Sequence, residues 1–349
     1  MSRVSRKLDH IQFSLETGQL RNHGFDDIVF VHQSLPEVSL DKIDISTKIG
    51  ELSLRSPIFI NAMTGGGGEE TFNINDKLSS IAHLNGLAMA VGSQMSAIRD
   101  RSQAYTYKIV RKNNPNGIVV ANLGFDARAD EAEAAVELLE ADAMQVHINV
   151  VQELVMPEGD RNFEHVLKNI EQIANRLSVP IIVKEVGFGI SRETSQKLFN
   201  AGVKVVDVGG YGGTNFAKIE NKRRDRMFNF FNDWGITTTA SIAEVARSTP
   251  LVSIIGSGGI QSALEIAKSI ALGASACGVA GYFLKILLQE GDEALDQEIK
   301  MISSDLRFIM TALGVSTIQE LQKAPLVIKG DTHHWLTQRK IDTLVYSNR

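Results

Sequence analysis

The sequence predicts an α/β protein, a single (β/α)8 barrel with an N-terminal β extension and a C-terminal helical tail. Two observations predict this fold. Eight short β-branched runs recur after residue 56, and helical patterns alternate with them. The runs are continuously apolar, as in parallel strands that are buried on both faces. Eight such units over roughly 250 residues match the size of a TIM barrel, and a doubly wound open sheet is the alternative.

The expected strands begin at Pro57, Leu87, Gly117, Ala143, Pro180, Val203, Leu251 and Ala274. Helical patterns between them cover residues 126–141, 163–177, 191–202, 241–248 and 262–274. The longest interruption of this rhythm is the glycine-rich segment 209–236, directly after the sixth strand. An insertion of that length at a barrel mouth is expected to form a lid or a binding loop.

Two regions flank the barrel strands. Residues 1–56 form the extension and contain two β-like pieces, DIVFVHQ and KIDISTKIGELSL, which are expected to cap the bottom of the barrel or to flank it. Residues 57–349 are expected to hold the barrel and its tail. The tail has three helical segments, YFLKILLQ, DEALDQEIKMISSDLRFIMTALG and TIQELQKA, which are expected to close the barrel and to support a subunit contact.

The composition narrows the class of protein. The 349 residues are 43% hydrophobic and carry a formal net charge of −5, which favours a folded core and argues against general nucleic-acid binding. Cys277 is the single cysteine, so an internal disulfide is excluded. The start, MSRVSRKLDHIQ, lacks the apolar core of a signal peptide, and no run of about 18 apolar residues follows. A cytoplasmic protein with a small-molecule partner, and without a membrane segment, is expected.

Polar residues gather where the expected strands end, and in a TIM barrel these ends face the active site. Each of them could instead cap the helix that follows, but their recurrence at most strand ends favours a site. They are Asn61, Thr64, Ser93, Gln94, Asn122, His147, Asn149, Lys184, Glu185, Asp207 and Thr214.

Glycine-rich loops follow the seventh and eighth expected strands, in GSGGI (256–260) and GVAGY (278–282). Glycines let backbone N–H groups approach a phosphate, and the N-terminus of the following helix adds partial positive charge. Loops after strands seven and eight are also the common phosphate site of this fold. A single glycine pair would indicate only a turn, whereas two at these strands predict a phosphate-bearing ligand.

Lys184 stands at the end of an otherwise apolar strand, PIIVKEVG, where a buried cation needs an anion or an acceptor. A flavin suits, because a cation near the pyrimidine side of the ring stabilises the reduced anionic form. Small residues in AMTGG (62–66) would let the flat ring lie against the backbone. The alternative is an ion pair of Lys184 with Glu185 or Asp207.

Several motifs together resemble the type 2 isopentenyl diphosphate isomerases, and the resemblance covers nearly the whole chain. They are RKLDHI near the N-terminus, NAMTGG, VGSQM (91–95), ANLG (121–124), HINVVQELVMPEGDR, KEVGFGIS (184–191) and VDVGGYGGTNF. This family interconverts isopentenyl and dimethylallyl diphosphate, with FMN that is reduced, normally by NADPH, and with a magnesium ion. The resemblance therefore implies FMN, Mg²⁺ and NADPH, and a homotetramer or homo-octamer.

The resemblance also implies roles for individual residues. Substrate contacts are expected from Arg6, Lys7, Ser93, Gln94, Met95, His147, Asn149 and Gln152, and Glu153 is expected to bind magnesium. FMN contacts are expected from Ala62, Met63, Thr64, Ser93, Asn122, Lys184, Thr214, Gly258, Gly259, Ala280 and Gly281. Without the resemblance, Arg6 and Lys7 would be interpreted as a solvated basic patch.

The expected isomerisation adds a proton to the terminal alkene carbon and removes one from the allylic carbon. No cysteine or paired carboxylate is evident for this role, so the hypothesis is that reduced FMN is the acid/base, assisted by Gln152, Lys184 and His147. The first alternative is an FMN-dependent α-hydroxy-acid oxidase or dehydrogenase. It needs a histidine base and arginines that grip a carboxylate, and no arginine stands at a neighbouring strand end. The second alternative is a non-catalytic flavin- or phosphate-binding protein.

Overall fold

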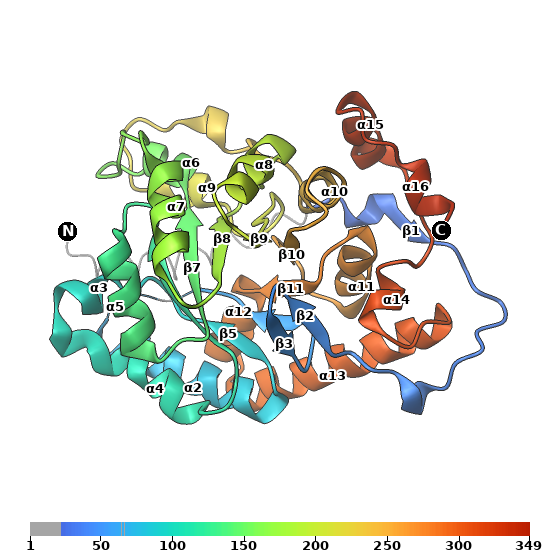
Figure 1. The fold of residues 1–349 in the computed structure, drawn as a ribbon, viewed down its shortest axis with the longest axis horizontal. Helices are drawn as coiled ribbons and strands as arrows, with labels where there is room; N and C mark the ends of the chain where they lie inside the picture. The colour runs from blue at the N-terminus through green and yellow to red at the C-terminus, as the bar shows by residue number, and fades with distance from the viewer. Residues whose placement is uncertain (1–21, 64, 66) are drawn as a thin grey trace.

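A computed structural model describes residues 22–63, 65 and 67–349 (Figure 1). Three residues predicted for the site, Arg6, Lys7 and Thr64, lie outside the described residues. No helix of the described part is long and apolar enough to cross a membrane.

Eight parallel strands form a closed barrel in chain order. They are β4 (Ile58–Ile60), β5 (Ala88–Ala90), β6 (Val119–Gly124), β7 (Ala143–Ile148), β8 (Ile181–Glu185), β9 (Val205–Asp207), β10 (Ser253–Ser257) and β11 (Ala276–Val279). The barrel closes where β11 pairs with β4, Val279 beside Ile60. The predicted (β/α)8 barrel is therefore confirmed, and the open sheet is wrong.

The helices of the barrel surround these strands. They are α2 (Gly68–Asn85), α3 (Met95–Arg99), α4 (Tyr105–Asn113), α5 (Ala129–Leu139), α6 (Val150–Val155), α7 (Val166–Arg176), α8 (Arg192–Asn200), α9 (Phe216–Asn221), α10 (Thr238–Ser248), α11 (Ala263–Leu272) and α12 (Gly281–Gln289). The five helices expected between strands are confirmed as α5, α7, α8, α10 and α11. The sequence analysis did not identify α2 and α4, which pack against each other.

A hairpin of the extension, β2 (Thr47–Ile49) and β3 (Leu52–Leu54), caps the bottom of the barrel. Ile49 and Leu54 are buried with the apolar side chains of the barrel interior. The Gly50 N–H donates to Ser253 Oγ at the first residue of β10, over 2.9 Å. Of the two β-like pieces of the extension, KIDISTKIGELSL therefore forms the cap at the bottom of the barrel.

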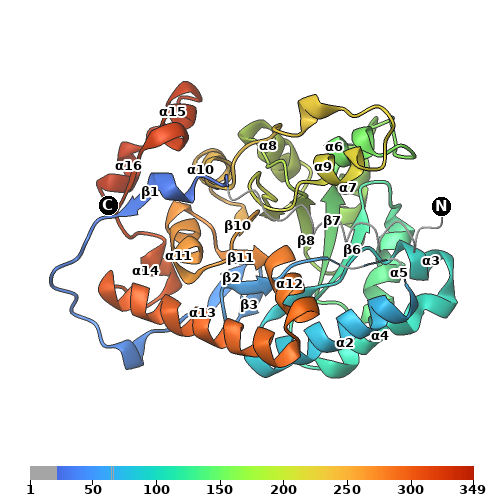
Figure 2. The same cartoon turned by 180° about the vertical axis from the view of Figure 1, so that it is seen from behind.

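The other β-like piece of the extension flanks the barrel. Its strand β1 (Ile28–Phe30) pairs antiparallel with β12 (Leu326–Ile328) of the C-terminal tail. The tail continues from α13 (Asp292–Ala312) and α14 (Ile318–Leu321), through β12, to α15 (Gly330–Gln338) and α16 (Leu344–Ser347). Figures 1 and 2 show α15 and α16 beside β1, at the opposite side of the molecule from α5. The sequence analysis did not identify α15 and α16.

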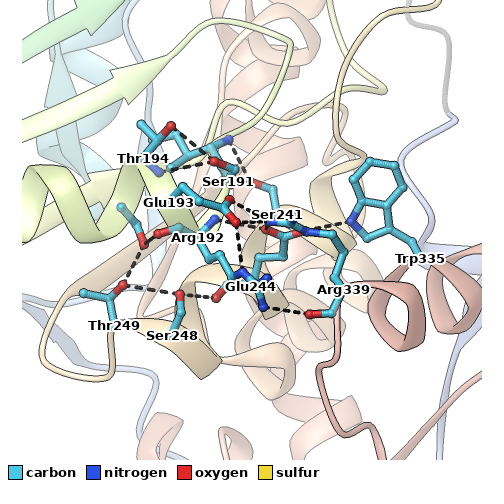
Figure 3. A network of polar contacts seen from close by, with 12 residues as sticks. Ser191, Arg192, Glu193, Thr194, Ser241, Glu244, Ser248, Thr249, Trp335 and Arg339 are labelled. Atoms are coloured by element: carbon cyan, nitrogen blue, oxygen red, sulfur yellow. Dashed lines mark hydrogen bonds and ion pairs between the residues drawn. The ribbon is translucent and has the colours of Figure 1, made fainter.

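A set of charged and polar side chains, the peripheral network, joins α15 to α8 and α10 (Figure 3). Its centre is Glu244, which is fully buried on α10. Glu244 accepts hydrogen bonds from Trp335 Nε1 over 2.8 Å, from Arg339 Nε over 2.9 Å and from the Arg192 N–H over 3.0 Å. Arg339 also donates to Glu193 over 2.6 Å. This network fixes the C-terminal tail to the barrel wall.

Candidate active site

A cavity of about 430 Å³ opens at the carboxyl ends of the barrel strands. Fifteen of the residues predicted for the site line it: Ala62, Met63, Ser93, Met95, Asn122, His147, Asn149, Gln152, Glu153, Lys184, Thr214, Gly258, Gly259, Ala280 and Gly281. The fold thus gathers residues from β4 to β11 around one space, which is large enough for a drug-sized ligand.

Gln94 does not line this cavity. Its side chain is fully buried and both ends are engaged by the backbone: Nε2 donates to Ala135 O over 3.0 Å, and Oε1 accepts from the Asn122 N–H over 3.0 Å. In this structure Gln94 therefore holds the backbone of Asn122.

The glycine-rich loops lie backbone to backbone at one side of the cavity. Gly258 and Gly259 have φ angles of 117° and 84°. A Cβ atom on Gly258 would lie 2.2 Å from Gly210 O, and one on Gly259 would lie 2.5 Å from Gly212 O. Helix α12 begins nearby at Gly281, which also lines the cavity. Only glycine fits at positions 258 and 259, where the two loops pass so close to each other. The backbone N–H groups of these glycines suit a phosphate.

Polar side chains inside the barrel form a continuous chain, here called the central network. His147 Nδ1 lies 3.0 Å from Asn122 Oδ1, and Asn122 donates to Gln145 Oε1 over 2.7 Å. Gln145 donates to Asn61 Oδ1 over 3.4 Å, and Asn61 donates to Asp207 Oδ2 over 2.6 Å. Gln145 was missed because it lies in the middle of β7 rather than at the end of the strand. The network fixes the orientation of the polar groups beneath the cavity.

His147 has a defined tautomer in this network. Because the Asn122 amide donates from its nitrogen to Gln145, its oxygen faces His147 and accepts from Nδ1–H.

Lys184 completes the central network at its other end. Its Nζ lies 3.5 Å from Asp207 Oδ2 and donates to the main-chain oxygen of Glu185 over 2.9 Å. The ion pair with Asp207, the alternative considered for Lys184, is therefore present. Lys184 is only 7% exposed, yet it lines the cavity. Its charge is therefore both paired and presented to a ligand.

The neighbouring Glu185 is also buried. Its carboxylate accepts from the N–H groups of Phe188 over 2.6 Å and Gly189 over 3.1 Å. Burial nevertheless raises the pKa of Glu185 to about 8. Burial therefore disfavours the ionised form of this carboxyl beside Lys184.

Asn149, at the start of α6, organises the next part of the cavity wall. Its Nδ2 donates to Gln152 Oε1 over 3.1 Å and to Glu153 Oε1 over 2.9 Å. Gln152 Nε2 in turn donates to Glu220 Oε1 over 3.3 Å. The short helix α6 thus places Gln152 and Glu153 side by side at the mouth.

Glu220, on α9, was missed by the sequence analysis. It is fully buried, and Arg223 donates to its Oε2 over 2.5 Å and to Glu158 over 2.6 Å. It lies in the segment 209–236, and no spacing in the sequence places it opposite Gln152. Thr214 and Phe216 of the same segment line the cavity. The glycine-rich insertion therefore forms part of the site wall.

The groups near Glu153 fit a magnesium ion that is shared with a ligand. Among the described residues no cluster of three or more His, Cys, Asp or Glu could hold a metal. Glu153 Oε2 accepts from the Asp160 N–H over 2.9 Å. Mg²⁺ commonly binds through one or two carboxylates together with ligand phosphates and water. If the ligand carries a phosphate, Glu153 is therefore enough as the one protein carboxylate that holds the ion.

Apolar side chains cover the rest of the cavity wall. They include Met63, Met95, Phe125, Met156, Phe216, Ile260 and Leu284. The site thus combines phosphate-binding loops, a buried cation, a carboxylate and an apolar surface, which suits a flat cofactor beside a small ligand with an alkyl part.

Comparison with known proteins identifies the class. A family model described as FMN-dependent dehydrogenase matches residues 80–328. A flavocytochrome b2 variant with sulfite bound shares the fold, with a TM-score of 0.67 and 17% identity over 96% of this chain and 85% of that chain. A lactate oxidase from Pediococcus acidilactici gives a TM-score of 0.67 and 14% identity over 91% of this chain and 87% of that chain. Fold and site therefore define an FMN-dependent (β/α)8 barrel enzyme.

Much closer relatives identify the family within this class. Isopentenyl-diphosphate delta-isomerases from Geobacillus sp. and Bacillus licheniformis are each 59% identical over 349 residues, which is 100% of both sequences. One from Bacillus cereus is 60% identical over the same length. The chain belongs to the FMN-dependent, type 2 isopentenyl-diphosphate delta-isomerase family.

Proposed function

We propose that this enzyme interconverts isopentenyl diphosphate and dimethylallyl diphosphate on reduced FMN. The observation that carries the proposal is that His147, Asn149 and Glu153 line the same cavity as Lys184 and the glycine-rich loops. A region suited to an anion with a metal ion and a region suited to a flavin would thus share one apolar-walled space, as a diphosphate with a short alkenyl chain requires.

The FMN phosphate would bind at Gly258, Gly259, Ala280 and Gly281, where glycine backbones and the start of α12 offer N–H groups. Lys184 would lie at the pyrimidine side of the ring, with Ala62, Met63 and Thr64 against its face. When bound and reduced, normally by NADPH, the cofactor supplies an acid/base beside the alkene.

The diphosphate would be neutralised by His147, Asn149, Arg6 and Lys7, and by Mg²⁺ on Glu153. Ser93 and Met95 would complete the substrate contacts, and Gln94 would act indirectly through Asn122. Gln152, held between Asn149 and Glu220, would orient the alkene. Because a glutamine is a poor acid, its role is to position, while the apolar wall keeps water from a carbocation-like state.

The α-hydroxy-acid oxidase or dehydrogenase is the second candidate, because solved structures with this fold include a lactate oxidase. The arginines that would grip a carboxylate are not among the described lining residues. Anaerobic incubation with lactate distinguishes the two functions. An oxidase would bleach its bound flavin, whereas the isomerase leaves the flavin oxidised.

The proposal is tested by an anaerobic assay of the purified protein with isopentenyl diphosphate, Mg²⁺, FMN and a reductant, each omitted in turn. Dimethylallyl diphosphate should form only in the complete mixture. FMN binding without any turnover in the complete mixture would instead support a non-catalytic flavin-binding protein. We further propose a cytoplasmic homotetramer or homo-octamer, which size-exclusion chromatography with light scattering measures directly.

A further inference from the structure

His23, from the N-terminal extension, lies directly behind the glycine-rich loops. It is 2% exposed, although the extension is far from these loops in sequence. A Cβ atom on Gly212 would lie 2.5 Å from His23 Cβ, and one on Gly259 would lie 3.1 Å from His23 Cδ2. Gly259 and the adjacent Gly213 line the cavity. The loops are therefore layered between His23 and the ligand space.

The backbone of His23 is fixed to the barrel. Its carbonyl oxygen accepts from both the N–H and the Oγ1 of Thr239 on α10, each over 3.1 Å. The next residue, Gly24, has a φ of 84°, and a Cβ atom there would lie 2.1 Å from Thr239 Oγ1. The segment therefore packs closely against α10, and this packing fixes the position of the His23 ring.

The ring also reaches the start of α11. His23 Nδ1 accepts from the Phe25 N–H over 3.2 Å, so the hydrogen of the neutral ring is on Nε2. Nε2 lies 3.2 Å from Glu265 Oε1, close enough for attraction although it is not aligned as a hydrogen bond. Glu265 Oε2 accepts from the N–H groups of Gln261 over 2.8 Å and Ser262 over 3.2 Å.

These contacts hold both ends of one short loop. The ring supports Gly259 from behind, and Glu265 holds residues 261 and 262 at the other end. We propose that His23 is a positioning residue for the phosphate of the cofactor, because it fixes the 258–262 loop with its backbone N–H groups directed to the ligand. The inference rests on the proposed location of the FMN phosphate at Gly258 and Gly259.

The test compares two ligands that differ only in the phosphate. Apoprotein is titrated with FMN and with riboflavin, and flavin fluorescence gives the two dissociation constants. The variant is His23→Asn, whose amide oxygen can still accept from the Phe25 N–H but which lacks the part of the ring behind Gly259. We expect FMN affinity to fall about tenfold, the worth of one phosphate hydrogen bond, while riboflavin affinity stays unchanged.

Two further variants separate positioning from general loss of packing. His23→Gln keeps a donor near the position of Nε2, so its ratio of FMN to riboflavin affinity should lie between those of the wild type and His23→Asn. It also serves as the test variant if His23→Asn does not fold. Asp27→Ala is the matched control, because Asp27 anchors the same segment through the Thr332 N–H over 2.8 Å. Its affinity ratio should equal that of the wild type.

The outcomes distinguish this inference from the proposed function. Wild-type apoprotein that binds FMN no better than riboflavin would overturn the phosphate site itself. A wild type that prefers FMN, together with His23 variants that keep the full preference, would overturn only the role of His23. An equal loss of both flavins in His23→Asn would also overturn it, since that result indicates general loss of packing.

Discussion

Two polar networks of this molecule, each with a fully buried carboxylate, serve different purposes. The peripheral network surrounds Glu244, whose hydrogen bonds come from Arg192, Trp335 and Arg339 of the protein itself. The central network ends at Lys184 and His147, and both of these line the cavity. A buried charge whose partners are all internal stabilises the fold, whereas one that also borders a cavity is available to a ligand.

The largest expected effect is on the fold. Glu244→Ala removes the fully buried carboxylate that accepts from the Arg192 N–H, Trp335 Nε1 and Arg339 Nε. At about 1 kcal/mol for each lost hydrogen bond, the free energy of unfolding should fall by about 3 kcal/mol. Chemical denaturation of the variant measures this change. Turnover per bound FMN should stay at the wild-type value. A large loss of turnover in the folded variant would mean that the two networks do not have separate roles.

Lys184→Met tests the central network. Asp207 keeps the Asn61 amide and the Gly209 N–H as donors, but it is fully buried and loses its cation, so unfolding free energy should fall by about 2 kcal/mol. Turnover should fall about 10²–10³-fold, the usual loss for one preorganised electrostatic group. Steady-state kinetics of the FMN-loaded variant gives this value. Nearly normal turnover would contradict a role for Lys184 at the flavin.

Glu153→Gln tests the role of the carboxylate at the cavity mouth. The amide keeps the shape of the side chain but loses the charge that suits Mg²⁺. We expect unchanged FMN binding and about tenfold weaker apparent magnesium binding, with activity partly restored at high Mg²⁺. A magnesium titration of activity checks this. An unchanged magnesium dependence would remove Glu153 as the metal ligand.

The smallest expected effect is at the exposed edge of the peripheral network. Hydrogen bonds from its own backbone N–H and from Arg192 lower the pKa of Glu193 to about 2, from an ordinary value of 4.5. The resulting stability is present above pH 4.5 and is lost as the pH falls towards 2. Because Glu193 is half exposed, solvent screening limits the effect to below about 1 kcal/mol. Unfolding curves of Glu193→Gln, measured over this pH range, should lack this loss of stability in acid. If the variant and the wild type lose stability equally between pH 4.5 and 2, Glu193 does not contribute to it.

The sequence predicted the barrel well because continuous apolar runs are typical of parallel strands that are buried on both faces. Segments such as Ile181–Glu185 are expected to be parallel strands covered by helices, and their number of eight favoured a closed barrel over an open sheet. The strand-end rule likewise brought Asn122, His147 and Lys184 together correctly. Both predictions depend on local pattern alone.

The parts that were missed depend on tertiary contacts. Glu220 meets Gln152 only because the 209–236 segment forms part of the cavity wall, and His23 meets Gly259 because the extension is held against α10 by Thr239. Gln94 illustrates the opposite case. Its motif, VGSQM, resembles the family closely and implies a substrate contact, but both ends of its side chain are hydrogen-bonded to the backbone.

The central claim is that the protein groups of the cavity hold and orient the substrate while reduced FMN serves as the acid/base. Reconstitution with 5-deazaFMN tests it most directly, because the analogue keeps the phosphate, ribityl chain and flat ring but lacks the basic nitrogen of the central ring. We predict that the analogue binds as FMN does and that anaerobic turnover of isopentenyl diphosphate falls about 10²–10⁴-fold. Nearly normal turnover by the reduced deazaflavin enzyme would contradict the claim and assign the proton transfer to a side chain such as Gln152 or Glu220.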